Sequence, residues 1–113
     1  MKHVIAFIQD RKLAQVTHAL HGIEGLTGMT ASSVRGFGRT RHGEGSRELT
    51  SELELLAQRV RLDIFCVDDL IEVVVETIRS TTHTGLRGDG KVYVAPIEDA
   101  LRIETGERGE RAV

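Results

Sequence analysis

Residues 84–94 combine side chains and spacing that could bind a phosphate. Gly85, Gly88 and Gly90 fall within six positions, and Lys91 follows directly. Glycine tolerates positive φ and lets a ligand approach the main chain, and successive N–H groups can form a concavity that fits an anion. Lys91 adds a mobile positive charge of the kind that binds phosphate. The spacing therefore predicts a phosphate-binding loop, although Gly-Asp-Gly also fits a helix end followed by a tight turn.

Other groups with catalytic or metal-binding potential are less well placed. His18 and His21 lie three positions apart on a predicted helix, which is a feasible spacing for two metal ligands. No third ligand accompanies them, so solvent-facing histidines are the better interpretation. Four serines have no histidine or acid at the spacing of a nucleophilic site: Ser32, Ser33, Ser46 and Ser51. The sequence therefore predicts neither a metal centre nor a serine hydrolase.

Length, charge and cysteine content exclude several classes of protein. The 113 residues fit one domain, residues 1–113, and so short a chain gains stability from oligomerisation. A net charge of −2 with mixed signs argues against a nucleic-acid binder, and no apolar run is long enough to span a bilayer. The N-terminal apolar run is too short for a secretory signal. Cys66 lies in an apolar segment, which predicts a buried thiol and a cytoplasmic location.

Hydrophobic periodicity predicts alternating strands and helices. Strands are expected at residues 2–9, 29–36, 59–67 and 90–95, with helices from about Lys12 to Gly22 and from Asp68-Asp69 to about Thr82. The two aspartates are expected to cap the second helix, and Tyr93 is expected in the core. This order predicts an α+β, ferredoxin-like βαββαβ fold, with a four-stranded antiparallel sheet and two helices on one face.

Three segments lie outside these regular elements. Residues 40–58 lack a clear period and predict a long exposed loop, with a helical turn possible near residues 48–56. Pro96 is expected to end the last strand, and residues 98–103 are expected to form a short closing element. The charged tail, residues 104–113, is predicted to be loose.

Two sequence blocks carry a resemblance to a known family. One reads T-G-x-x-G-D-G-K-V-Y-V at residues 84–94, followed by Pro96 and R-I-x-T-G-E at 102–107. The other reads G-M-T at 28–30 and V-R-G-F-G-R at 34–39. Their sequence and separation resemble the PII signal-transduction proteins, nearly end to end. The resemblance implies a homotrimer with an adenine nucleotide in each cleft between subunits, and no other cofactor.

The resemblance also implies which residues contact the nucleotide. The base would meet Ile8, Gly36 and Phe37 of one chain and Thr30, Asp63 and Phe65 of the next. The phosphates would meet Gly38, Arg39, Gly88, Asp89, Gly90 and Lys91, with Arg102 from the neighbour. Main-chain approach at the glycines and a bidentate arginine clamp suit these roles.

Four positions depart from the nitrogen-sensing members of that family. Thr40 replaces a glutamine that helps to hold Mg²⁺ and 2-oxoglutarate, and Arg59 replaces a lysine that meets 2-oxoglutarate. Glu104 replaces a phosphate-binding arginine, and Glu52 stands in place of the modified tyrosine. If residues 102 and 104 lie on a strand, both point to the same side, so Glu104 would repel a distal phosphate. ADP or AMP is therefore expected to bind at least as well as ATP.

These features predict a regulatory protein rather than an enzyme. Nucleotide binding would control an unidentified target, an enzyme or transporter, through loop 40–58. Arg41, His42, Arg47 and Arg59 could bind a small anion such as bicarbonate. The alternatives are a small nucleotide hydrolase that uses Glu44, Glu48 or Asp89, a 2-oxoglutarate-responsive nitrogen regulator, and a structural trimer with a vestigial site.

Overall fold

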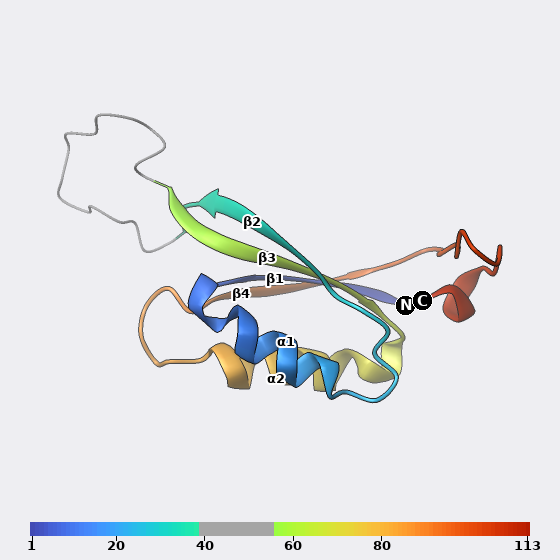
Figure 1. The fold of residues 1–113 in the computed structure, drawn as a ribbon, viewed down its shortest axis with the longest axis horizontal. Helices are drawn as coiled ribbons and strands as arrows, with labels where there is room; N and C mark the ends of the chain where they lie inside the picture. The colour runs from blue at the N-terminus through green and yellow to red at the C-terminus, as the bar shows by residue number, and fades with distance from the viewer. Residues whose placement is uncertain (39–55) are drawn as a thin grey trace.

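The computed structural model describes residues 1–38 and 56–113. Its elements run in the order β1 (Lys2–Ile8), α1 (Leu13–His21), β2 (Thr30–Gly36), β3 (Ala57–Cys66), α2 (Ile71–Thr82) and β4 (Gly90–Pro96). Short 3-10 turns, η1 (Asp10–Lys12) and η3 (Asp68–Leu70), lead into the helices, and η4 (Gly109–Ala112) lies near the C-terminus. The strand order is β2-β3-β1-β4 with every pair antiparallel, and both helices cover one face (Figure 1). The predicted ferredoxin-like fold is confirmed.

The core lies between the two helices and the sheet. Alternate side chains of the two central strands face the helices and are buried: Val4, Ala6, Ile8, Val60, Leu62, Ile64 and Cys66. The helix α2 adds Val74, Ile78 and Thr82, which are four residues apart and so share one face. Cys66 is free and buried, as predicted, and burial raises the pKa of its thiol.

No helix within residues 1–38 and 56–113 covers the opposite face of the sheet (Figure 1), and we call it the open face. Strand alternation places His3, Ile5 and Phe7 there. Tyr93 lies directly opposite Ile5 in the β1–β4 pair, so it shares this face and is 51% exposed. The prediction that Tyr93 lies in the core is therefore wrong for the single chain, because an apolar strand does not reveal which of its faces the helices cover.

Segment boundaries differ from the predictions in two places. Ala57 and Gln58, expected in the loop, begin β3 because they pair with Gly36 and Arg35 of β2. Residues 98–103 form no helix or strand. Leu101 instead makes a bridge with Arg108, and Arg108 forms an ion pair with Asp99. The tail expected to be loose thus contains a closed turn. Residues 40–55 of the predicted loop lie outside the described residues.

The predicted aspartate cap of the second helix is also wrong. Val67 occupies the N-cap position of η3, and no side chain caps that turn. The carboxylate of Asp68 instead accepts a hydrogen bond from the Met1 amino group, at 2.8 Å. This interaction ties β1 to the start of the α2 segment, and it lowers the pKa of Asp68.

None of the helices formed by residues 1–38 and 56–113 is long and apolar enough to cross a bilayer.

Two adjacent valines of α2 provide a matched test of the core. Val74 is fully buried and Val73 is 44% exposed. We expect Val74→Ala to lower the free energy of unfolding by about 1.5–3 kcal/mol, because two buried methyl groups and their packing are lost. Val73→Ala should change it by less than about 0.5 kcal/mol. Urea unfolding at one fixed protein concentration measures both, and equal losses would contradict the described orientation of α2.

Candidate functional site

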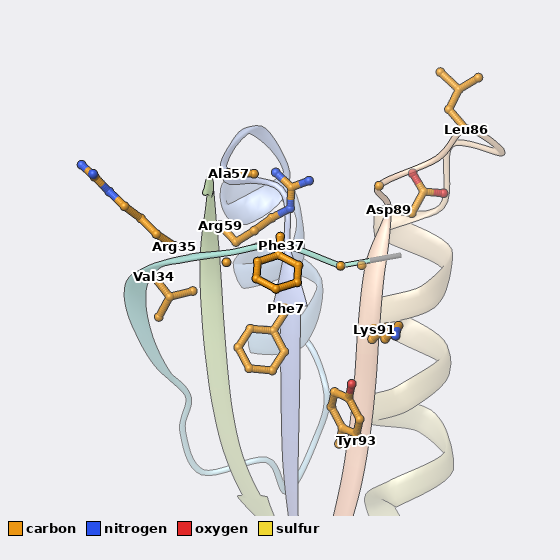
Figure 2. Close-up of a pocket in the computed structure, with 14 residues that line it drawn as sticks. Phe7, Val34, Arg35, Phe37, Ala57, Arg59, Leu86, Asp89, Lys91 and Tyr93 are labelled. Atoms are coloured by element: carbon orange, nitrogen blue, oxygen red, sulfur yellow. The ribbon is translucent and has the colours of Figure 1, made fainter. Parts of the chain in front are cut away.

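A groove of about 560 Å³ lies where the ends of β2 and β3 approach the loop before β4 (Figure 2). Its apolar wall includes Phe7, Phe37, Leu86 and Tyr93. Phe7 and Tyr93 meet edge to face, with ring centroids 6.2 Å apart. The complete lining is Phe7, Val34, Arg35, Gly36, Phe37, Gly38, Ala57, Arg59, Leu86, Gly88, Asp89, Gly90, Lys91 and Tyr93.

The groove brings together the two sequence blocks that predicted a nucleotide site. Gly36, Phe37 and Gly38 come from the end of β2, and residues 88–91 come from the loop and the start of β4. The two blocks lie far apart in sequence and belong to the two outer strands of the sheet. They line one groove because the antiparallel register places the end of β2 and the start of β4 at the same end of the sheet. Arg39, expected beside them, lies outside the described residues.

The Asp89 carboxylate closes the loop between α2 and β4. It accepts hydrogen bonds from the Thr84 amide at 2.8 Å, from the Thr84 hydroxyl, and from the Gly85 amide at 3.3 Å. The Thr84 hydroxyl oxygen also accepts a bond from the Leu86 amide, at 3.1 Å. The Thr84 side chain, followed by these amides, holds the pKa of Asp89 below its ordinary value. Asp89 is thus an ionised structural group that shapes the loop.

Gly90 is required where the loop enters β4. Its φ is +117°, and a Cβ built at this position would lie 1.9 Å from the Phe7 carbonyl oxygen. Any side chain would therefore break the pairing of Gly90 with Ile8. Gly88 also has positive φ, at +87°. The alternative prediction, that Gly85, Gly88 and Gly90 form a helix end and a tight turn, does not describe this loop well. The helix α2 ends at Thr82, before these glycines, and His83 is extended.

The interior of the loop leaves main-chain donors available. Within the part of the chain that the structure describes, the amides of Arg87, Gly88 and Asp89 donate no hydrogen bond. Lys91 follows on the open face, directly opposite Phe7. Successive free amides followed by a lysine form an arrangement suited to an anion. The groove can therefore accept a phosphate beside an aromatic surface.

A second group of predicted contacts lies farther along the open face. Thr30 pairs with Asp63, and Phe65 follows two residues later on the same side of β3. From Thr30 to Gly36 the chain advances six residues, or roughly 20 Å along a strand. Thr30 and Gly36, which are both implied to contact the base, therefore cannot reach the same base from a single chain.

Asp63 is held by two side chains of its own chain. Arg61 donates from Nε and Nη2 at 3.0 and 2.9 Å, and His3 Nε2 lies 2.7 Å from the same carboxylate. The bond from Arg61 is the main reason that the pKa of Asp63 lies below its ordinary value. The His3 ring stacks on Phe65 at 4.4 Å. Sequence analysis did not identify His3 or Arg61, although their odd-numbered positions on the two strands place them on the open face.

Ile8 was predicted to meet the base, but its side chain lies in the core and is 1% exposed. Phe7 lines the groove instead, because adjacent strand residues face opposite sides. The continuous apolar run of β1 hid this alternation. Phe7, Leu86 and Tyr93 are therefore lining residues that the sequence analysis missed.

Arg102 and Glu104 do not lie on a strand. The Arg102 amide donates to the Glu107 carbonyl at 2.9 Å, and the Gly106 amide donates to the Arg102 carbonyl at 2.7 Å. Both residues belong to the turn between Leu101 and Arg108, so the argument that they point to the same side is wrong. Both side chains are exposed and lie outside the groove of their own chain.

The metal interpretation gains no support in the described ranges. No group of three or more histidine, cysteine, aspartate or glutamate side chains gathers at metal-binding distance within residues 1–38 and 56–113. His18 and His21 are exposed on α1.

Comparison with known proteins decides the family. The family model for nitrogen regulatory protein P-II matches residues 1–107. The chain belongs to the P-II family. It is 39% identical to nitrogen regulatory protein P-II of Azospirillum brasilense and 40% identical to that of Cereibacter sphaeroides, over the whole of each chain. It is 38% identical to nitrogen regulatory protein P-II 2 of Methanothermobacter thermautotrophicus, covering all of this chain and 97% of the relative. The family is one of regulators, which agrees with the prediction of a regulatory protein.

Acidification should open the 84–90 loop of this P-II protein. Because the folded-state pKa of Asp89 is lowered, its bonds stabilise the loop above the ordinary aspartate pKa of about 4 and are lost as the pH falls through the folded value. NMR protection factors for the Thr84 and Gly85 amides should therefore be constant near neutrality and fall below about pH 4.

The Ile23 amide provides the control, because it donates to the Leu20 carbonyl at 3.0 Å and depends on no carboxylate. Its protection should persist to lower pH. Simultaneous loss at all three amides would mean global unfolding and would contradict the assigned role of Asp89.

Proposed function

We propose that this P-II protein binds an adenine nucleotide with its phosphates on the 84–91 loop and its base on the aromatic wall of the groove. The observation that carries the proposal is the closed loop with three successive free amides, followed by Lys91. Aromatic rings suit a planar base, and amides with a lysine suit phosphate oxygens. Binding would signal to a target enzyme or transporter in the cytoplasm through loop 40–58, as a regulatory family implies.

We further propose that the complete site forms between subunits of a homotrimer. Thr30 and Gly36, both implied base contacts, lie six residues or roughly 20 Å apart on β2, so a neighbour would supply Thr30 together with Asp63 and Phe65. That face also exposes large rings that a soluble assembly would cover: Phe65 is 47% exposed and Tyr93 51%. The same assembly would place Arg102 of the C-terminal turn at a neighbour's phosphates.

ADP or AMP should bind at least as well as ATP. Because Glu104 lies in a turn, the direction of its side chain no longer supports this order, and the remaining support is charge. Glu104 is acidic, whereas the nitrogen-sensing members of the family carry a basic residue at this position. Arg59 lines the groove beside Gly88 and provides a cation for a second, small anion such as bicarbonate.

The names of the relatives favour nitrogen regulation as the competing physiological assignment.

A nucleotide hydrolase is the weaker alternative. Asp89 is the only one of its three candidate acids within the described residues, since Glu44 and Glu48 fall in the gap. Its carboxylate is already engaged by Thr84 and Gly85, and its pKa is lowered, so it is a poor general base. Release of phosphate from ATP at a rate that depends on Asp89 would favour this alternative.

Calorimetric titration of ADP into the native protein and Lys91→Ala tests nucleotide binding. We expect the substitution to weaken binding by about 1.5–3 kcal/mol, because one charge-assisted contact is lost. Lys12→Ala, a change at η1 outside the groove, should have little effect. Parallel titrations of AMP and ATP measure the order of affinity. Equal ADP affinity in the Lys91→Ala and native proteins would contradict the proposal that the loop binds phosphate.

Sedimentation equilibrium tests the assembly. We expect a species of three times 12.5 kDa at micromolar concentration. An Ile5→Glu substitution on the open face should favour the monomer, because burying an unpaired charge is costly. Glu24→Gln, an exposed change after α1, is the control. A native monomer at this concentration would contradict the shared site.

A further inference from the structure

Gln9 connects the end of β1 to the middle of the 84–90 loop. Its side-chain Nε2 donates a hydrogen bond to the Gly88 carbonyl oxygen at 2.9 Å, across 79 positions of sequence. A Cβ added at Gly88 would lie 3.7 Å from the same nitrogen, so the two groups are in close contact. Gln9 is partly buried, which protects the bond from competition with water. The middle of the loop therefore has a second anchor besides Asp89.

Arg11 fixes which end of the Gln9 amide faces the loop. Arg11 Nε donates to Gln9 Oε1 at 2.8 Å. If the amide turned over, its oxygen would face the Gly88 carbonyl oxygen and its NH₂ group would face the guanidinium, with no acceptor on either side. Arg11, Gln9 and Gly88 thus form a chain of two hydrogen bonds with one allowed direction.

This chain of bonds sets the orientation of the peptide between Gly88 and Asp89. The described residues contain no cis peptide, and in a trans peptide the carbonyl and the following N–H point to opposite sides. Because the Gly88 carbonyl points to Gln9, the Asp89 amide points away from Gln9. That amide is one of the three free donors proposed to bind phosphate.

Without Gln9 the same peptide would have an alternative. Turning this peptide over rotates ψ of Gly88, which glycine allows at little cost, and brings φ of Asp89 toward positive values, which aspartate tolerates better than most residues. A turned peptide would present a carbonyl oxygen where the phosphate needs an N–H, and the two oxygens would repel each other. The Asp89 side chain does not prevent this, since its bonds go to residues 84 and 85.

We infer that Gln9 is a positioning residue that holds the Gly88–Asp89 peptide with its amide turned toward the bound phosphate, and that Arg11 orients Gln9 for this role. The inference rests on the proposed nucleotide binding. The loop would be prepared by the strand that also pairs with Gly90, so β1 sets both the position of the loop and the direction of its donor.

Gln9→Met provides the direct test, because methionine preserves length and removes both the donor and the acceptor. Gln15→Met, at an exposed position on α1, is the matched control. We expect Gln9→Met to weaken ADP binding about 3- to 10-fold, as loss of one positioned hydrogen bond would, with the trimer and Tm unchanged. In the absence of nucleotide, the amide ¹⁵N shift and exchange rate of Asp89 should change, while those of Thr84 and Gly85 stay the same. Gln15→Met should change none of these.

Arg11→Met tests the orienting role from the surface, where misfolding is not expected. Lys12→Met, which removes the same charge one residue away, is its control. Arg11→Met should weaken ADP binding more than Lys12→Met does. In the Gln9→Met background the two substitutions should become equal, because the Arg11–Gln9 bond no longer exists.

The outcomes separate the two proposals. Native protein that binds neither ADP nor ATP would end the proposed function, whereas the ligand-free Asp89 amide would still report whether Gln9 orients the peptide. An unchanged Asp89 amide in Gln9→Met, or ADP affinity equal to that of Gln15→Met, would overturn the positioning role. A general loss of Tm with no specific change at Asp89 would also overturn it, since Gln9 would then be a packing residue.

Discussion

The pairing of β1 with β4 is the constraint on which the site depends. Where Ile8 meets Gly90, the Phe7 carbonyl leaves no space for a side chain, so the two strands can approach only through glycine. This contact fixes where the 84–90 loop ends, and it places Lys91 opposite Phe7 on the open face. The same strand buries Val4, Ala6 and Ile8 against the helices. One central strand therefore joins the core to the proposed phosphate-binding loop.

Charged and polar side chains near the 84–90 loop form hydrogen bonds that hold the loop in place before any ligand binds. Asp89 satisfies the donors at one end of the loop, and Gln9 satisfies an acceptor at its middle. The amides between them are left free. A loop arranged in this way loses little conformational freedom on binding, which favours affinity. It also explains why a carboxylate in the middle of a phosphate-binding motif need not repel the ligand: its charge is directed toward Thr84 and Gly85.

Another part of the open face is organised by a second carboxylate. Asp63 is held by Arg61 and His3, and His3 stacks on Phe65. The partners of Asp63 come from the two central strands, so the group is set by strand register rather than by a loop. The closed 84–90 loop and this strand surface would supply the two halves of the proposed site between identical subunits. In the proposed trimer, Ile5 and Tyr93, which lie in the same row of the open face as Asp63, would contribute apolar surface to the assembly.

The sequence by itself determined the family and the fold, because the glycine-rich block and strand–helix periodicity are local properties of neighbouring residues. It also predicted Gly88, Gly90 and Lys91 as site residues from chemistry that one segment contains, and all three line the groove. Tertiary structure decided which face each strand residue occupies: Ile8 went to the core, Phe7 to the groove and Tyr93 to the open face, although all lie in apolar runs. It also decided contacts across long separations, such as Gln9 with Gly88 and His3 with Asp63. Such pairs depend on strand register, which no local pattern in a single sequence specifies.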